Sequence, residues 1–160
     1  MKTAFLITAR LKSTRLPKKI LLEVAGKPLI VHMLDRIKNA MSIDKIIICT
    51  STNPQDDPLE EIAGQEQVSC FRGSEEDVLV RLLEAAQSHG LKYFANITAD
   101  CPMMDPLLID RAVLEYQKTN VDLLKYDDSN ADLPFNCYLV KVSALEKVCQ
   151  QKKETDTEAW

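Results

Sequence analysis

The 160-residue sequence lacks the two glycine-rich motifs that most often mark a phosphate-binding loop. It contains neither G-x-x-x-x-G-K-S/T nor G-x-G-x-x-G, and it has only four glycines in all. These absences argue against a P-loop nucleotide hydrolase and against a dehydrogenase that binds a dinucleotide. Any phosphate binding would therefore depend on cationic side chains and on backbone N–H groups at strand ends.

Long apolar runs and paired cysteines are also missing. No apolar run approaches the roughly 20 residues that span a bilayer, and no signal peptide is visible, so we expect a cytoplasmic protein without a membrane segment. The five cysteines are odd in number and widely spaced, with no C-x-x-C, which favours free thiols over a disulfide framework or a metal site. There is no internal repeat or low-complexity linker, and the length is typical of one domain, residues 1–160.

The charge is modest overall but unevenly distributed. The net charge is −4, which argues against general nucleic-acid binding. Residues 1–38 hold nine Lys/Arg and two Asp/Glu, a local charge of +7, whereas the remainder carries −11. Part of the positive excess lies in one short loop, which suits a small anionic ligand better than a long duplex.

Apolar runs alternate with helical patterns along the whole chain. Strands are expected at residues 3–8, 45–50, 68–71, 93–98, 121–124 and 137–142. Helices are expected to begin at Pro28, at Asp57–Pro58, at the capping-box-like segment Ser74–Asp77, at Asp105–Pro106 and at Ser143. The alternation predicts a three-layer α/β/α, Rossmann-like domain with a mostly parallel sheet and helices on both faces.

A cationic loop follows the first expected strand. Five cations stand in ten positions: Arg10, Lys12, Arg15, Lys18 and Lys19. Cations crowded in one loop repel each other, and open α/β sheets bind their ligands at the carboxyl ends of the strands. The loop is either a solvated surface loop or an anion site, and its position favours the anion site, with a polyphosphate as the first candidate ligand.

A carboxylate, Asp100, follows the fourth expected strand directly. It could cap the next helix, or it could hold Mg²⁺, which prefers one or two carboxylates together with substrate phosphates. We favour the metal role for Asp100 and the helix-cap role for Asp105, which stands next to Pro106.

Three segments together resemble the cytidylyltransferases that activate acidic sugars, above all their relatives of the spore-coat-polysaccharide type. The matching segments are Arg10-x-x-Ser13-Thr14-Arg15-Leu16-Pro17-x-Lys19, Arg72-Gly73-Ser74-Glu75-Glu76-Asp77-Val78-Leu79-x-Arg81, and Ala99-Asp100-Cys101-Pro102, which is similar to the family's Gly-Asp-x-Pro motif. The segments follow the family's order at three successive positions of the expected ligand crevice. The resemblance covers residues 3 to about 148 and implies a fold of the nucleotide-diphospho-sugar transferase type.

The resemblance implies an activity and a set of site residues. The activity is transfer of CMP from CTP to an acidic sugar with release of pyrophosphate, with Mg²⁺ as cofactor, for surface polysaccharide biosynthesis, in a possible homodimer. The catalytic residues implied are Arg10, Lys19 and Asp100, the last as the metal ligand. The nucleotide-binding residues implied are Ala9, Arg10, Ser13, Arg15, Lys19, Arg72, Asp77 and Arg81.

The chain also departs from the family. Lys18 and Ala99 stand where the family usually has glycine. Family members are usually longer, so we expect this chain to lack the carboxyl-terminal portion that supplies a second metal-binding Asp; Asp156 and Glu158 are weak substitutes. Asp77 and Arg81 are four residues apart and could instead form a simple surface pair on a helix. Three other functions stay open: a nucleotidyltransferase for another base or sugar phosphate, a truncated or degenerate nucleotide-binding module without catalysis, and a purely structural interaction protein.

Overall fold

A six-stranded sheet forms the centre of the computed structural model, which describes residues 2–13, 16–119, 121–127 and 136–155. The strand order is β5-β4-β1-β6-β8-β7. The strands are β1 (Ala4–Thr8), β4 (Lys45–Ser51), β5 (Ser69–Gly73), β6 (Tyr93–Thr98), β7 (Leu123–Asp127) and β8 (Asn136–Lys141). Neighbours from β5 to β6 pair in parallel, and β8 runs antiparallel to both β6 and β7. The predicted mostly parallel sheet is confirmed.

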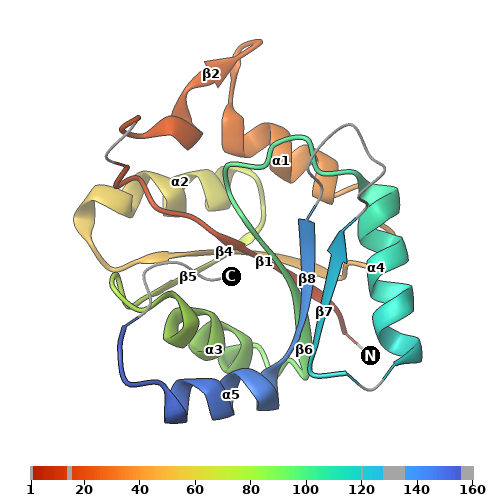
Figure 1. The fold of residues 1–160 in the computed structure, drawn as a ribbon. Helices are drawn as coiled ribbons and strands as arrows, with labels where there is room; N and C mark the ends of the chain where they lie inside the picture. Colours follow the sequence, from red (N-terminus) through yellow and green to blue (C-terminus); the bar gives the residue numbers. More distant parts are fainter. Residues whose placement is uncertain (1, 14–15, 120, 128–135, 156–160) are drawn as a thin grey trace.

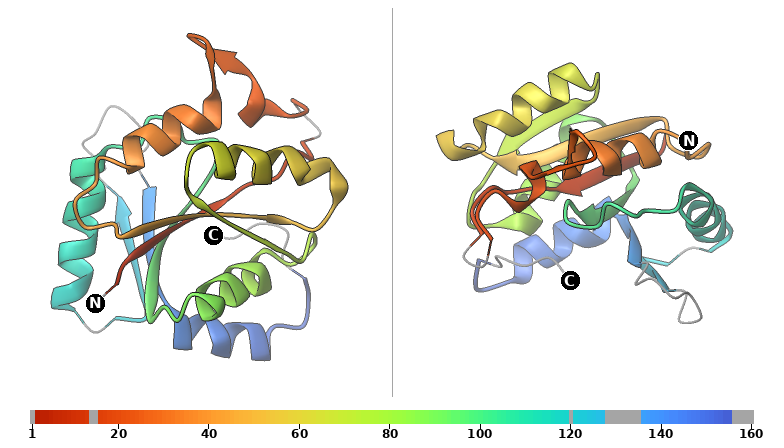
Figure 2. Two further views of the ribbon diagram at one scale, coloured as in Figure 1. Left: turned by 180° about the vertical axis from the view of Figure 1, so that it is seen from behind. Right: turned by 90° about the horizontal axis from the view of Figure 1, so that it is seen from above.

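Helices cover both faces of this sheet (Figures 1 and 2). The helices are α1 (Leu29–Ile37), α2 (Asp57–Gln65), α3 (Val78–Ser88), α4 (Pro106–Lys118) and α5 (Val142–Gln151). Apolar residues of α1, α2 and α4 pack in one core, and those of α3 and α5 pack in the other. The three-layer α/β/α prediction is therefore confirmed.

The central strands are apolar on both faces because each face has its own core. In β4, Ile46 and Ile48 belong to the core with α1, α2 and α4, whereas Ile47 and Cys49 belong to the core with α3 and α5. This alternation follows from the period of two in a strand, and it explains why the strand reads as a continuous apolar run. Such a buried strand holds the polar residues that follow it in fixed positions.

Several element boundaries differ from the sequence prediction. The turn at residues 26–28 is part of a small antiparallel hairpin of β2 (Glu23–Val24) and β3 (Lys27–Pro28), and Pro28 is the N-cap of α1 rather than its first residue. Its two turn residues, Ala25 and Gly26, have φ of 50° and 78°, as a tight two-residue hairpin requires. The expected strand at 121–124 lies at Leu123–Asp127 instead.

Three helix starts also differ. Asp77, not Ser74, caps α3, and its side chain accepts a hydrogen bond from the Val80 N–H at 3.0 Å. Helix α5 begins at Val142, one residue before Ser143. Asp57 lies in the first turn of α2 rather than capping it, because a short 3₁₀ turn, η2 (Pro54–Asp56), leads directly into the helix. Of these three helices, only α3 has a side-chain cap at its N-terminus, so sequence signals for capping residues could not place the other two starts to the residue.

Two expectations from composition can be compared with the fold. All five cysteines are free thiols, as expected. In the described part of the chain, no helix has the length and apolar character needed to cross a membrane. Most of the acidic loop expected at residues 126–134 lies outside the described residues.

Candidate functional site

The loops after β1 and β6 begin side by side. Thr8 and Thr98 are partners in the parallel pairing of these strands. The pairing of β1 with β6 continues past the strands, because the Ala99 N–H donates to the Thr8 carbonyl at 2.9 Å. On the other side of β1, the Ala9 N–H donates to the Cys49 carbonyl of β4 at 3.1 Å. The cationic loop and the segment with Asp100 therefore leave the same edge of the sheet at adjacent positions.

These two segments meet through an ion pair. The Lys19 ammonium lies 2.8 Å from the Asp100 carboxylate, and the Thr98 hydroxyl donates to the other carboxylate oxygen at 2.6 Å. Both charged side chains keep about two fifths of their surface exposed, 39% for Lys19 and 42% for Asp100. Partial burial alone would raise the pKa of Asp100, but the hydrogen bonds from Lys19 and Thr98 outweigh burial and lower that pKa below its ordinary value. Asp100 is thus a fixed, ionised carboxylate that an incoming ligand can reach.

The neighbouring Cys101 has no comparable reactivity. Burial and the adjacent Asp100 charge raise the pKa of its thiol. Because the thiolate is the nucleophilic form, this residue is a poor nucleophile at neutral pH.

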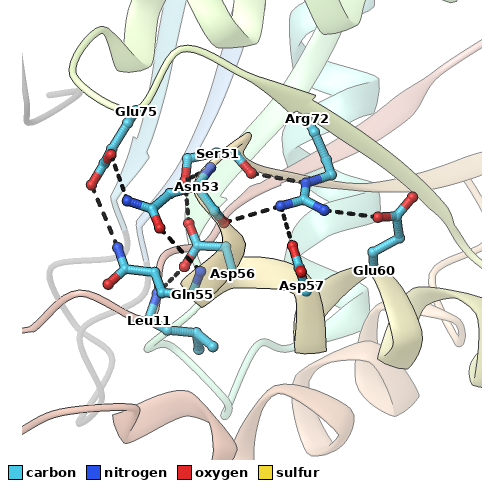
Figure 3. A network of polar contacts seen from close by, with 9 residues as sticks. All are labelled: Leu11, Ser51, Asn53, Gln55, Asp56, Asp57, Glu60, Arg72 and Glu75. Carbon is cyan, nitrogen blue, oxygen red and sulfur yellow. Dashed lines mark hydrogen bonds and ion pairs between the residues drawn. The ribbon is translucent and has the colours of Figure 1, made fainter.

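The start of the cationic loop is anchored by a buried carboxylate, Asp56. One oxygen of Asp56 accepts the Leu11 N–H at 2.8 Å and the other accepts the Ser51 hydroxyl at 2.5 Å (Figure 3). Both Leu11 and Asp56 are buried. This contact fixes the path of the backbone between Arg10 and Lys12.

The end of the loop is closed by a left-handed residue. Lys18 has φ 54° and ψ 27°, and its N–H donates to the Leu11 carbonyl at 3.2 Å. Glycine adopts this conformation without cost, so a glycine would suit the position that Lys18 occupies. The loop then enters a short 3₁₀ turn, η1 (Lys19–Leu21), which carries Lys19 toward Asp100.

The other predicted residues of this loop are placed as follows. Ala9 is buried where the loop leaves the sheet. The Ser13 hydroxyl accepts the Leu16 N–H at 3.2 Å. The Arg10 guanidinium donates to the Glu75 carbonyl at 3.5 Å. Arg15 lies outside the described residues.

Arg72 organises the neighbouring loop after β4. Its guanidinium donates to the Ser51 and Asn53 carbonyls, each at 3.0 Å, and forms ion pairs with Asp57 at 2.6 Å and Glu60 at 2.9 Å (Figure 3). The contacts with Asp57, the larger cause, and with Glu60 raise the pKa of the Arg72 guanidinium, so the charge is permanent. Arg72 thus fixes the wall of the site next to the cationic loop.

Arg81 is fully buried, with no exposed surface. One guanidinium nitrogen donates to the Ser74 carbonyl at 2.5 Å, while Nε and Nη2 have no hydrogen-bond partner among the described residues. Desolvation is the main reason that its pKa is lowered. The surface pair with Asp77 that the spacing allowed does not form, because the Asp77 carboxylate instead contacts the Lys152 ammonium. The guanidinium supports the β5–α3 loop from beneath.

The carboxylate available at this site suits a weakly held Mg²⁺ better than a metal ion that protein side chains surround. Among the described residues, no group of three or more His, Cys, Asp and Glu side chains could hold a metal ion. Asp100 is a single accessible carboxylate on a rigid strand end, and Mg²⁺ commonly takes one or two carboxylates with water and substrate phosphates as its other ligands. Asp156 and Glu158, the weak candidates for a second carboxylate, lie outside the described residues.

Asp105 performs the cap role that the sequence predicted for it. Its carboxylate accepts the Leu107 N–H at 2.9 Å, at the start of α4. Asp105→Ala is therefore expected to lower the free energy of unfolding by about 1 kcal/mol, the usual loss for an N-cap carboxylate. Urea unfolding measures this loss, and unchanged stability would contradict the cap assignment.

Comparison with known proteins gives the family. A family model described as cytidylyltransferase matches residues 4–158. The 3-deoxy-manno-octulosonate cytidylyltransferase of Brucella suis is 36% identical over 132 residues, which cover 77% of this chain and 49% of that protein. The spore coat polysaccharide biosynthesis protein SpsF of Bacillus subtilis is 34% identical over 110 residues, which cover 66% of this chain and 46% of that protein.

Similarity to a solved structure agrees with the family model. A cytidylyltransferase from Leptospira borgpetersenii matches with a TM-score of 0.89 and 30% sequence identity, over 97% of this chain and 66% of that one. The match thus includes nearly all of this chain, although the chain spans less than half the length of the two curated relatives above. The chain belongs to the cytidylyltransferase family.

Proposed function

We propose that this chain forms the CTP-binding part of an enzyme that transfers CMP to an acidic sugar and releases pyrophosphate. The observation that carries the proposal is the 2.8 Å contact between Lys19 and Asp100, which joins two matching segments at the carboxyl ends of β1 and β6. Relatives named for 3-deoxy-manno-octulosonate and for spore coat polysaccharide support an acidic sugar and a role in surface polysaccharide synthesis.

The proposed roles follow from charge and position. Arg10 and Lys19 would bind the β and γ phosphates of CTP, because guanidinium and ammonium groups donate charge-assisted hydrogen bonds to phosphate oxygens. Ser13, Arg15 and the backbone at Ala9 would line the same loop. Arg72, Asp77 and Arg81 would act at the nucleoside side. Asp77 caps α3, and Arg81 is buried beneath the β5–α3 loop. This geometry supports an indirect role for these two residues.

The reaction is a displacement at phosphorus. A sugar hydroxyl would form a bond to the α-phosphorus while the bond to pyrophosphate breaks, and the hydroxyl proton would leave to solvent. The chain's residues would hold the reactants in line and neutralise the charge that develops on pyrophosphate. When bound by Asp100, Mg²⁺ would supply Lewis-acid stabilisation of the phosphate oxygens. The magnesium requirement, the homodimer and the cytoplasmic location stay predictions.

The experiment that tests this function measures pyrophosphate release. The protein is incubated with each of CTP, UTP, GTP and ATP, together with 3-deoxy-manno-octulosonate, an acylneuraminate or a neutral sugar 1-phosphate. The proposal expects release that requires both CTP and a sugar acid. Release with a neutral sugar phosphate, or with another nucleotide in preference to CTP, would replace it with a different nucleotidyltransferase activity. Nucleotide binding without release from any pair would contradict catalysis by this chain.

A further inference from the structure

Two cations of the loop after β1 contact one acidic residue, Glu75, in the β5–α3 loop. The Lys12 ammonium lies 3.4 Å from the Glu75 carboxylate, and Arg10 donates to the Glu75 backbone carbonyl at 3.5 Å. Lys12 is 58% exposed, whereas Glu75 is only 24% exposed. The cation is thus the more exposed partner, and the carboxylate is the more enclosed one.

The Glu75 carboxylate is held in place by two amides. Asn53 donates to one oxygen at 2.9 Å, and Gln55 donates to the other at 3.4 Å (Figure 3). The hydrogen bond from Asn53, together with the charges of Lys12 and Arg10, lowers the pKa of Glu75 below its ordinary value. At neutral pH this position therefore holds a negative charge next to Arg10, a predicted phosphate ligand, and next to Lys12 of the same cationic loop.

The loop that carries Glu75 is supported from beneath. The buried Arg81 guanidinium donates to the Ser74 carbonyl at 2.5 Å, and the Asp77 N–H donates to the Ser74 hydroxyl at 3.0 Å. A carboxylate on such a fixed loop stays in place when a cation leaves it, because the amides of Asn53 and Gln55 still hold it. It can therefore exchange partners without rearrangement of the fold.

We propose that Glu75 is a counter-ion that competes with the phosphate groups of the ligand for Lys12 and Arg10. It is a positioning residue, because it acts through the two cations. The carboxylate occupies the place of an anion while no phosphate is bound, and it weakens the hold of these cations on pyrophosphate after the transfer. Glu75 thereby favours release of the anionic product. The inference rests on the proposed function in one respect, namely that the ligand is a polyphosphate.

The test compares binding of inorganic pyrophosphate to the wild-type protein and to Glu75→Gln by isothermal titration calorimetry at low salt. Glutamine retains an oxygen that can accept from Asn53 but removes the charge. The Kd for pyrophosphate is expected to fall by about fivefold in this variant, since one charge near a cation pair at a partly exposed site has a modest effect. The difference in pyrophosphate affinity between Glu75→Gln and the wild-type protein is expected to shrink at high salt. Glu75→Asp restores a carboxylate and is expected to return the Kd toward the wild-type value.

A matched control removes a carboxylate from a distant ion pair. Glu115→Gln breaks a 3.4 Å pair with Lys118 on α4, and it is expected to leave pyrophosphate binding unchanged. An equal or weaker affinity in Glu75→Gln would overturn the counter-ion role and leave Glu75 as a support of the loop. If none of the proteins binds pyrophosphate, the proposed function fails together with the inference. Binding by all of them with equal affinity defeats the inference alone.

Discussion

Asp100→Asn is expected to lower kcat/KM for CMP transfer by about a hundredfold to a thousandfold, the usual loss when a preorganised charge-stabilising group is removed from an active site. The asparagine oxygen can still accept from Thr98, but it loses the negative charge that the proposed magnesium site needs. Stability is expected to change little, because Asp100 and Lys19 form a partly exposed ion pair, and such pairs contribute about 0–1 kcal/mol. Steady-state kinetics and a thermal melt separate these two effects.

The control for this variant is Asp105→Asn, five residues further along the same segment. Asp105 caps α4 and makes no contact with Lys19, so we expect near wild-type turnover from that protein. Full magnesium-dependent turnover in Asp100→Asn would show that this carboxylate does not hold the metal. Equal losses in both variants would point to a general disturbance of the loop after β6.

Asp56→Ala is expected to lower the free energy of unfolding by about 3 kcal/mol, because hydrogen bonds to a charged group contribute about 1.5–3 kcal/mol each when removed from a buried site. Asp56 has no exposed surface and accepts from both the Leu11 N–H and the Ser51 hydroxyl. Both donors would be left without this partner, and the backbone between Arg10 and Lys12 would lose its anchor. We therefore expect weaker nucleotide binding as well. Urea unfolding and calorimetry measure the two effects.

The adjacent residue supplies the matched control for Asp56. Asp57 is also an aspartate of this segment, but its carboxylate is largely exposed and pairs with Arg72 on the surface. Asp57→Ala is expected to change stability by less than about 1 kcal/mol. Similar losses in the two variants would contradict the view that the buried Asp56 anchors the cationic loop.

The main layout of the site could be predicted from the sequence. The strand Ala4–Thr8 and the strand Tyr93–Thr98 are both buried and apolar, and each is followed at once by polar residues. Ligands bind at the carboxyl ends of parallel strands, so both segments were candidates for one site. The structure adds that the two strands are neighbours, which lets Lys19 reach Asp100.

The supporting contacts could not be predicted in the same way. Asp56 and Glu75 stand in segments that read as a turn and a helix start, because short-range patterns say nothing about partners far away in the sequence. Asp56 bonds to Leu11, 45 residues away, and Glu75 contacts Lys12, 63 residues away. For Asp56 the sequence signal was polarity next to Asn53-Pro54, directly after a buried strand, whereas Glu75 stood within the family-like segment from Arg72 to Arg81. The burial of Arg81 could not be predicted either, since a helical arginine usually lies on the surface.

The central claim is that the Lys19–Asp100 site binds CTP, and a thermal melt with CTP, UTP, GTP and ATP, each with and without Mg²⁺, tests it most directly. A ligand at about 100 times its Kd stabilises the folded state by about 2.7 kcal/mol, which a melt detects. The account predicts the largest shift with CTP, a further increase with Mg²⁺, and loss of most of that shift in Lys19→Ala. Equal shifts with all four nucleotides, no shift with any, or a full CTP shift in Lys19→Ala would contradict it.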